Sequence, residues 1–315
     1  MSEQDVRGMD RRGLLMRCAG WAGAGALYTL SGGVFSSMMM DAARAAVPHG
    51  GRTKPFTFVQ ISDTHLGFDK AANPDVRATC LASVAKIKAL AQKPDLVVHT
   101  GDISHLSKDA QFDDAKAIMD GIGVPVFYIP GEHDMLDEGG GKAFLAHFGK
   151  GSLGRGWYSF DHNGVHFVAL NNVSDLKPGG MAHLGDDQLG WLKQDLAGLS
   201  ASTPIVVLGH IPLWTVYADW GWGTDDSAQA LALLGRFGSV TVLNGHIHQV
   251  IQKVEGNVTF HSARSTAYPQ PAPGAAPSPG PLKVPAAQLP TMLGIRTANF
   301  TTGQAPIALI DTPLA

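Results

Sequence analysis

The chain has 315 residues, of which 44% are hydrophobic and 16% are charged. This is enough apolar sequence for one large hydrophobic core or two modest ones. Its formal net charge of −3 excludes a general electrostatic attraction to nucleic acid or to anionic membranes, so we expect no nucleic-acid partner. Its two cysteines exclude a disulfide framework. An anionic substrate would have to be attracted locally, for example by metal ions.

The first 45 residues predict an export signal that is not part of the fold. Arg11 and Arg12 begin a twin-arginine pattern, an uncharged stretch follows over residues 18–40, and residues 43–45 (Ala-Arg-Ala) offer a cleavage site. The alternative is a retained N-terminal membrane anchor, since the uncharged stretch is long enough to cross a bilayer. Its glycines and serines favour the cleaved signal. We therefore expect a periplasmic or extracytoplasmic protein that meets the membrane only during export.

The remaining residues, 46–315, predict one α/β domain. Its first elements alternate between strand and helix, with strands at 56–61, 96–100 and 124–129 and helices at 75–92 and 108–119. This alternation implies a parallel sheet with right-handed crossover connections.

The second half of the domain is richer in β-hairpins. An Asn-Gly turn at residues 163–164 predicts the first hairpin. The expected elements are strands at 157–160 and 165–170, a helix at 186–199, strands at 204–208 and 240–243, a hairpin of 250–254 with 258–261, and a closing strand at 307–310. Residues 268–290 are rich in Pro, Ala and Gly and lack periodicity, so they predict an extended loop.

Acidic or histidine side chains follow five of the predicted strands, at the point where each strand ends. The candidate metal ligands among them are Asp63, His65, Asp102, Glu132, His210, His246 and His248. Because ligands of open α/β sheets bind at the carboxyl edge of the strands, we expect these side chains to converge. Seven ligands are too many for one tetrahedral ion and suit two ions that share a carboxylate.

With these motifs in this order, the chain resembles the calcineurin-like metallophosphoesterase superfamily over roughly residues 56–261. The resemblance implies an α/β fold of two mixed β-sheets packed together and flanked by helices. It also implies two metal ions, Fe, Mn or Zn. One would be held by Asp63, His65 and His248, the other by Glu132, His210 and His246, with Asp102 bridging them.

The resemblance further implies a reaction. The two ions would acidify a bridging water, and the resulting hydroxide would attack phosphorus in line with the leaving group. His133 would face the phosphoryl group as a hydrogen-bond donor, and Asp134 would orient His133. The expected substrate is a small-molecule phosphate ester, for which a phosphodiester is favoured and a phosphomonoester is the alternative. The alternative is a catalytically weak or inactive binding module with this fold.

One position departs from the family pattern, because Glu132 stands where the family usually has Asn. With two divalent ions, a bridging hydroxide, Asp63 and Asp102, an Asn site sums to about +1, and Glu132 lowers this to about 0. One hypothesis is that a trivalent ion such as Fe(III) restores the charge. The other is that Glu132 swings aside, or binds the same metal without much consequence.

Candidate substrate residues come from two further stretches. Four aromatic residues follow His210, and two of them, Trp214 and Tyr217, are candidates either for a pocket wall or for the hydrophobic core. Arg264 leaves the last hairpin near the same edge, where it would either clamp a phosphate or lie on the surface. His105 is a candidate for the pocket or for a loop surface.

Overall fold

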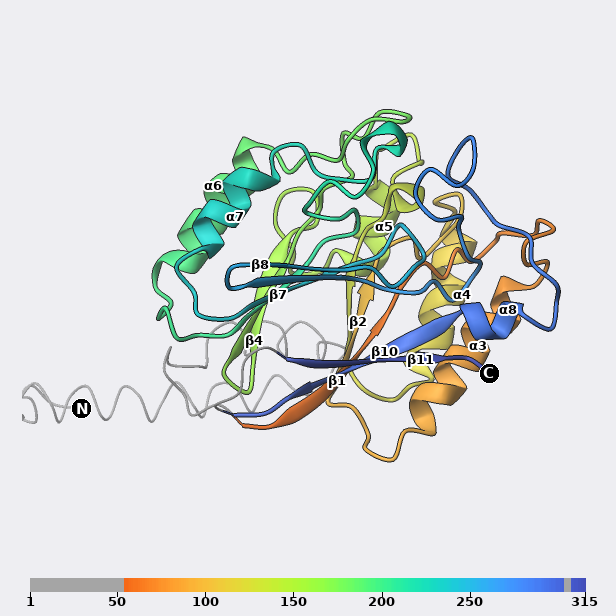
Figure 1. Ribbon diagram of the computed structural model, residues 1–315, viewed down its shortest axis with the longest axis horizontal. Helices are drawn as coiled ribbons and strands as arrows, with labels where there is room; N and C mark the ends of the chain where they lie inside the picture. Colours follow the sequence, from red (N-terminus) through yellow and green to blue (C-terminus); the bar gives the residue numbers. More distant parts are fainter. Residues whose placement is uncertain (1–53, 303–306) are drawn as a thin grey trace, which may run out of the picture. The chain divides into compact units, whose positions relative to one another are not determined.

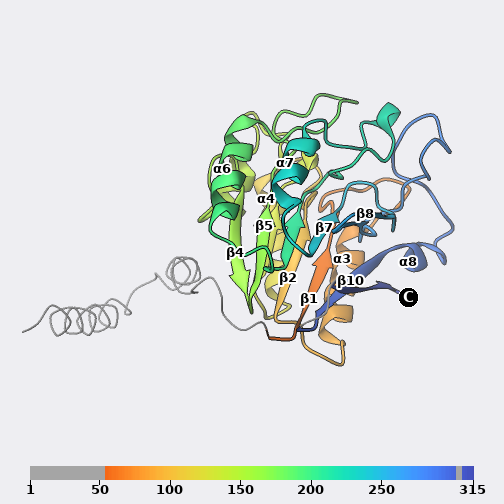
Figure 2. The same cartoon turned by 60° about the vertical axis from the view of Figure 1, so that its left-hand side comes forward.

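The computed structural model describes residues 54–302 and 307–315, and the predicted export signal lies outside these residues. Among them, no helix is long and apolar enough to cross a membrane. They form two β-sheets packed against each other, with helices on the outer faces (Figures 1 and 2). This confirms the fold that the family resemblance implies.

The first sheet has five strands in the order β11-β10-β1-β2-β3. Strands β1 (Phe56–Ile61), β2 (Leu96–Thr100) and β3 (Val126–Ile129) are parallel, and helices α3 (Val76–Lys88) and α4 (Asp109–Asp120) connect them. This is the predicted β-α-β-α-β order. Strands β10 (Gly294–Phe300) and β11 (Ala308–Pro313) extend the sheet in antiparallel fashion beyond β1, which makes the sheet mixed.

The second sheet has six strands in the order β4-β5-β6-β7-β9-β8. Its strands are β4 (Tyr158–His162), β5 (Val165–Ala169), β6 (Ile205–Leu208), β7 (Val240–Asn244), β8 (Gln252–Glu255) and β9 (Val258–Ser262). Both predicted hairpins, β4–β5 and β8–β9, are present. In the first, Asn163 and Gly164 both have positive φ, as the predicted Asn-Gly turn requires.

Three apolar layers hold the sheets and helices together. The central layer lies between the sheets and joins side chains such as Phe58 and Val98 to Phe167 and Leu208. Helices α3, α4 and α5 (Lys142–Phe148) cover the other face of the first sheet. Helices α6 (Asp186–Ala197) and α7 (Ser227–Leu234) cover the other face of the second. Both sheets are therefore buried on two faces, and their strand ends face a common edge.

The long predicted loop is present as a segment without strands. After β9 the chain forms only turns until α8 (Leu289–Met292), a short helix just before β10. The first residues of this loop, from Ser265 to Gln270, pack against the strand ends at the common edge.

Candidate metal centre

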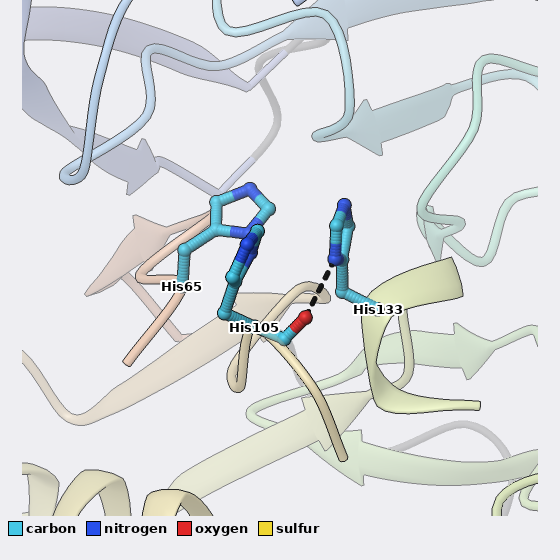
Figure 3. A group of neighbouring side chains, drawn as sticks. All are labelled: His65, His105 and His133. Atoms are coloured by element: carbon cyan, nitrogen blue, oxygen red, sulfur yellow. Dashed lines mark hydrogen bonds between the residues drawn. The ribbon is translucent and has the colours of Figure 1, made fainter. Parts of the chain in front are cut away.

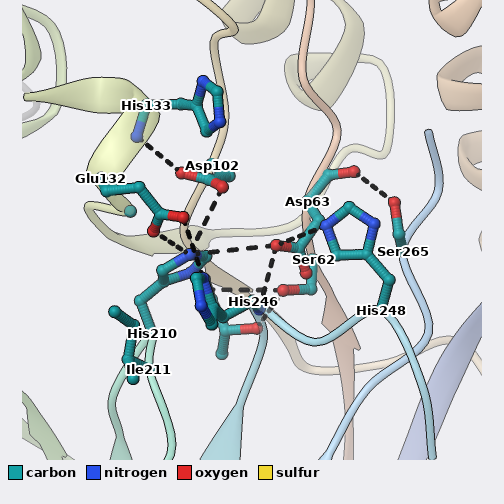
Figure 4. Close-up of polar contacts among 12 residues, drawn as sticks. Ser62, Asp63, Asp102, Glu132, His133, His210, Ile211, His246, His248 and Ser265 are labelled. Carbon is teal, nitrogen blue, oxygen red and sulfur yellow. Dashed lines mark hydrogen bonds and ion pairs between the residues drawn. The ribbon is translucent and has the colours of Figure 1, made fainter. Parts of the chain in front are cut away.

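The seven predicted ligands converge at the carboxyl ends of five strands. Figure 4 shows them except for His65, which Figure 3 shows. A first group contains Asp63 and His65, from the loop after β1, and His248, from the loop after β7. His248 Nε2 lies 3.3 Å from Asp63 Oδ1 and 3.4 Å from His65 Nε2. We call these three residues the first ligand group.

The second ligand group is Glu132, His210 and His246. One carboxylate oxygen of Glu132 lies 2.9 Å from His246 Nδ1, and the other lies 2.9 Å from His210 Nε2. Both oxygens of Glu132 thus face the two histidines in the metal-free protein. Asp102 stands between the groups, with Oδ2 at 3.5 Å from His65 Nε2 and 3.4 Å from His210 Nε2.

Several potential ligand atoms of these groups are buried without a contact of hydrogen-bond geometry. Asp63 Oδ2 is one of them, and Glu132 Oε2, His210 Nε2 and His246 Nδ1 have only ion-pair contacts with other candidate ligands. Buried polar atoms rarely stay unpaired, so such a cluster is the signature of a site for an absent group. The opposite ring nitrogens of His210 and His248 donate to the carbonyls of Thr100 and Tyr268, each at 2.6 Å, which aims Nε2 inward. Mixed carboxylates and imidazoles fit first-row transition-metal ions.

Opposite charges face each other within the second ligand group of the metal-free protein. Burial raises the pKa of Glu132, but His246 and His210 outweigh it and hold that pKa well below its usual range. Burial lowers the pKa of His210, but Asp102 and Glu132 outweigh it and hold that pKa well above its usual range. Because a metal ion binds neutral imidazole, an ion here would displace a proton.

The backbone at the ligands is strained. Only a few described residues other than glycine have positive φ, and five of them are ligands: Asp63 (54°), His65 (42°), Asp102 (52°), His246 (68°) and His248 (53°). The motif glycines have a steric role here. A Cβ at Gly131 would overlap Asp102 Oδ1, and one at Gly101 would overlap the ring of His210.

His133 lies beside the ligand groups, and its ring is contacted by His105, which belongs to neither group (Figure 3). Its backbone N–H donates to Asp102 Oδ1 at 2.9 Å, and its Nδ1 lies 2.8 Å from the carbonyl oxygen of His105. The His105 ring stacks on the His133 ring with centroids 4.7 Å apart. The His105 carbonyl and ring thus set the orientation of His133.

The predicted role of Asp134 needs correction, because its carboxylate does not contact the His133 ring. It accepts hydrogen bonds from the backbone N–H groups of Ile103 (3.0 Å), Ser104 (2.8 Å) and Gly131 (3.0 Å). Asp134 therefore joins the loop after β2 to the loop after β3. Burial, with Asp102 nearby, raises the pKa of Asp134 to about 7.

A cavity of about 450 Å³ opens next to the ligand groups. Its walls include His105, His133, Trp220, Trp222 and Tyr268, together with loop residues 173–174, 176–180 and 279–281. Glu132 and His246 also reach it, so the cavity is continuous with the second ligand group. The lining holds a single Lys or Arg side chain, the exposed Lys177.

The three predicted substrate residues do not line this cavity. Trp214 is 9% exposed and packs on Phe260 in the core beneath the second sheet. Tyr217 packs against Trp220 from outside the lining. Arg264 donates to the carbonyl of Thr291 at 2.6 Å. Two later aromatics of the same stretch, Trp220 and Trp222, form the wall instead.

Comparison with known proteins agrees with this geometry. The model of the calcineurin-like phosphoesterase family matches residues 56–250. A 3′,5′-cyclic-nucleotide phosphodiesterase of Nostoc sp. is 26% identical over 68% of this chain and 79% of its own. A probable glycerophosphodiester phosphodiesterase of Arcobacter nitrofigilis is 24% identical over 67% of this chain and 78% of its own.

Solved structures show the same fold at lower identity. A dimetal phosphatase from Danio rerio superposes with a TM-score of 0.57 at 14% identity, covering 81% of this chain and 98% of its own. The match of the family model extends over more than half of the chain and includes all seven ligands. The chain therefore belongs to the calcineurin-like phosphoesterase family.

Proposed function

We propose that the chain is a hydrolase of small-molecule phosphodiesters that uses two metal ions. The observation that supports this best is the position of Asp102 between two complete ligand groups. One ion would be held by Asp63, His65 and His248. The other would be held by Glu132, His210 and His246, and Asp102 would contact both ions. A binding module that had lost catalysis would have no need of a complete set, so the geometry favours the enzyme.

The ions, whether Fe, Mn or Zn, would supply Lewis acidity at phosphorus and a water acidic enough to act as a nucleophile near neutral pH. The chain's own contribution is positioning. His133 faces the cavity with its Nδ1 tied to the His105 carbonyl, so its other ring nitrogen is available to the substrate. Burial lowers the pKa of His133, but Asp102 and Glu132 outweigh it and raise that pKa, which favours the imidazolium. In that form the second nitrogen carries a proton and would donate to the leaving oxygen or to a non-bridging oxygen.

A phosphodiester suits this site better than a phosphomonoester. A diester carries one negative charge, whereas a monoester carries nearly two at neutral pH. The cavity lining offers one exposed lysine, and Glu132 adds a negative charge beside the ions. The relatives named as cyclic-nucleotide and glycerophosphodiester phosphodiesterases act on diesters, which supports the same preference.

The test combines metal analysis with activity against a matched phosphodiester and phosphomonoester. We expect about two ions per chain and faster diester hydrolysis. His133→Ala should keep both ions and lower turnover by about 100-fold or more. A chain that binds two ions and hydrolyses neither ester would contradict the proposal, and loss of an ion in the variant would give His133 a ligand role.

We also propose export through the twin-arginine route, on the basis of Arg11, Arg12 and the stretch that follows them. Replacing both arginines by lysine should keep the protein in the cytoplasm, as measured by cell fractionation. Export that is unchanged in this variant would contradict the proposal.

A further inference from the structure

The phenol of Tyr268 is a polar group at the metal centre that the proposed chemistry does not use. Its side chain is buried, at 3% exposure. Its hydroxyl lies 3.1 Å from His65 Nε2, which is its single hydrogen-bond contact among the described residues. Tyr268 also lines the cavity, so the same residue contacts a candidate ligand and borders the space for substrate.

A metal ion on His65 would take away the acceptor of this hydrogen bond, which already meets Nε2 off the axis of its lone pair because the two rings are stacked. Of the two ring nitrogens of His65, Nε2 is the one that faces Asp102 and His248, so it is the nitrogen that would bind the ion. Its lone pair would then be committed to the metal. The Tyr268 hydroxyl would lose its acceptor while remaining buried, and an unpaired buried hydroxyl costs about 1–3 kcal/mol. A phosphoryl oxygen of a bound substrate would supply the acceptor that the hydroxyl then lacks.

The hydroxyl is not placed as a metal ligand. The rings of Tyr268 and His65 are stacked, with centroids 4.8 Å apart and planes inclined by 27°. The lone pair of Nε2 lies in the plane of the imidazole, whereas the phenol lies across its face. The hydroxyl thus stands beside the direction in which His65 would bind an ion, where it can reach an oxygen of a bound substrate.

The backbone of Tyr268 is held rigidly in this place. Ser265 Oγ donates to the carbonyl of Asp63 at 2.8 Å, a contact that Figure 4 shows, and accepts from the backbone N–H of Tyr268 at 3.2 Å. The carbonyl of Tyr268 accepts from His248 Nδ1 at 2.6 Å. The ring is further packed against Phe68. A donor that needs no rearrangement to act is the kind that stabilises a developing negative charge best.

We propose that the Tyr268 hydroxyl donates a hydrogen bond to a non-bridging phosphoryl oxygen of the substrate. This inference rests on the proposed function, since it needs a phosphate ester at the ligand groups. In a cavity with a single exposed cation, a neutral donor of this kind helps to bind the phosphoryl group without favouring a dianion.

The first test is Tyr268→Phe, which removes one oxygen atom and keeps the ring. We expect kcat to fall by about 10- to 100-fold with both ions retained. The matched control is Tyr158→Phe. Tyr158→Phe also removes a phenol hydrogen bond, to the carbonyl of Tyr128 at 2.9 Å, but Tyr158 lies outside the cavity lining. The control should keep the activity of the unchanged protein.

The second test measures the affinity of the metal-loaded protein for inorganic phosphate by calorimetry. We expect Tyr268→Phe to weaken this affinity by about tenfold, and the Tyr158→Phe control to leave it unchanged. Because this measurement needs no turnover, it separates the two proposals. A protein that binds phosphate through Tyr268 but hydrolyses no ester would contradict the proposed function alone.

Two outcomes would overturn the role of Tyr268. One is a Tyr268→Phe variant with unchanged turnover and phosphate affinity. The other is a visible charge-transfer band in the Fe(III)-loaded protein that disappears in the variant, since this would make the phenolate a metal ligand instead of a donor to the substrate.

Discussion

Glu132 contributes a negative charge to the second ligand group, because its surroundings keep its carboxylate ionised. Each of its oxygens faces a histidine at 2.9 Å, and its carboxylate stays ionised because the two histidines outweigh the effect of burial on its pKa. A neutral side chain at this position would leave the ions with more positive charge and would strengthen their attraction for anions. The selectivity between esters of different charge should follow from this residue.

We therefore predict that Glu132→Asn shifts the preference toward phosphomonoesters. The ratio of monoester to diester kcat/KM should rise by about tenfold, which corresponds to about 1.4 kcal/mol of added attraction for the second negative charge. Steady-state kinetics with matched esters measures it. Glu138→Gln, at an exposed residue outside the cavity lining, is the control for the same change in net charge. An unchanged ratio in Glu132→Asn would mean that Glu132 does not control this selectivity.

The candidate ligands were predictable because each follows a strand that the sequence marks by its apolar run. Parallel strand ends meet at one edge, so order along the chain was enough to bring seven side chains together. The cavity wall was not predictable in this way. Tyr268 and Trp222 lie in loops without periodicity, and no local pattern distinguishes them from Tyr217, which packs outside the lining.

At the scale of elements, His166 connects the hairpin of the second sheet to the helix that covers it. It lies in β5 with Nδ1 at 2.9 Å from Asp161 of β4 and Nε2 at 2.9 Å from Asp195 of α6. Burial lowers its pKa, but the hydrogen bonds to the two carboxylates outweigh this and raise it to about 9. A protonated His166 therefore stabilises the packing of α6 on the sheet.

This arrangement predicts a pH dependence of stability. The folded pKa lies above the unfolded value of about 6.5, so the contribution of His166 is complete below pH 6.5 and is lost as the pH rises through 9. A shift of this size is worth about 3 kcal/mol. The free energy of unfolding, measured with urea at pH 6 and pH 9.5, should fall between these pH values by most of this amount. In His166→Gln this difference between the two pH values should disappear. His183→Gln, at a half-exposed histidine, should change the loss little. If His166→Gln lost as much stability between the two pH values as the unchanged protein, His166 would not have this role.

The missed elements were those whose sequences carry no clear period. Strand β10 was not predicted, because Arg296 and Asn299 interrupt its apolar residues, although the strand pairs with both β1 and β11. Helices α5 and α7 were also missed, since seven and eight residues are too few to establish helical spacing. In each case contacts with distant parts of the chain, which local patterns do not report, decide the structure.

Arg296 acts at the scale of the whole domain, because it joins the two sheets. Its side chain is 1% exposed and forms a double hydrogen bond to Asp311, at 2.9 and 3.0 Å. It also donates to the carbonyl of Ser262, at the end of β9 in the other sheet, at 2.8 Å. Removing this group leaves a carboxylate and a carbonyl without partners in a largely buried place.

We predict that Arg296→Leu lowers the free energy of unfolding by about 3–5 kcal/mol. Arg77→Leu is the matched control, because Arg77 pairs with Asp114 through two similar bonds but lies on the surface. Its loss should cost less than about 1 kcal/mol. Equilibrium denaturation measures the free energy of unfolding of both variants. Equal losses would show that Arg296 stabilises the domain no more than a surface ion pair does.

The left-handed backbone at the ligands has a thermodynamic consequence. Each non-glycine residue in this conformation costs about 1 kcal/mol, so the five together cost about 5 kcal/mol, the lower end of the net stability of a domain. Glycine at any of these positions would relieve the strain but would offer no ligand atom. The stability of the metal-free protein is therefore reduced by the residues that present the ligand atoms, which are Asp63, His65, Asp102, His246 and His248.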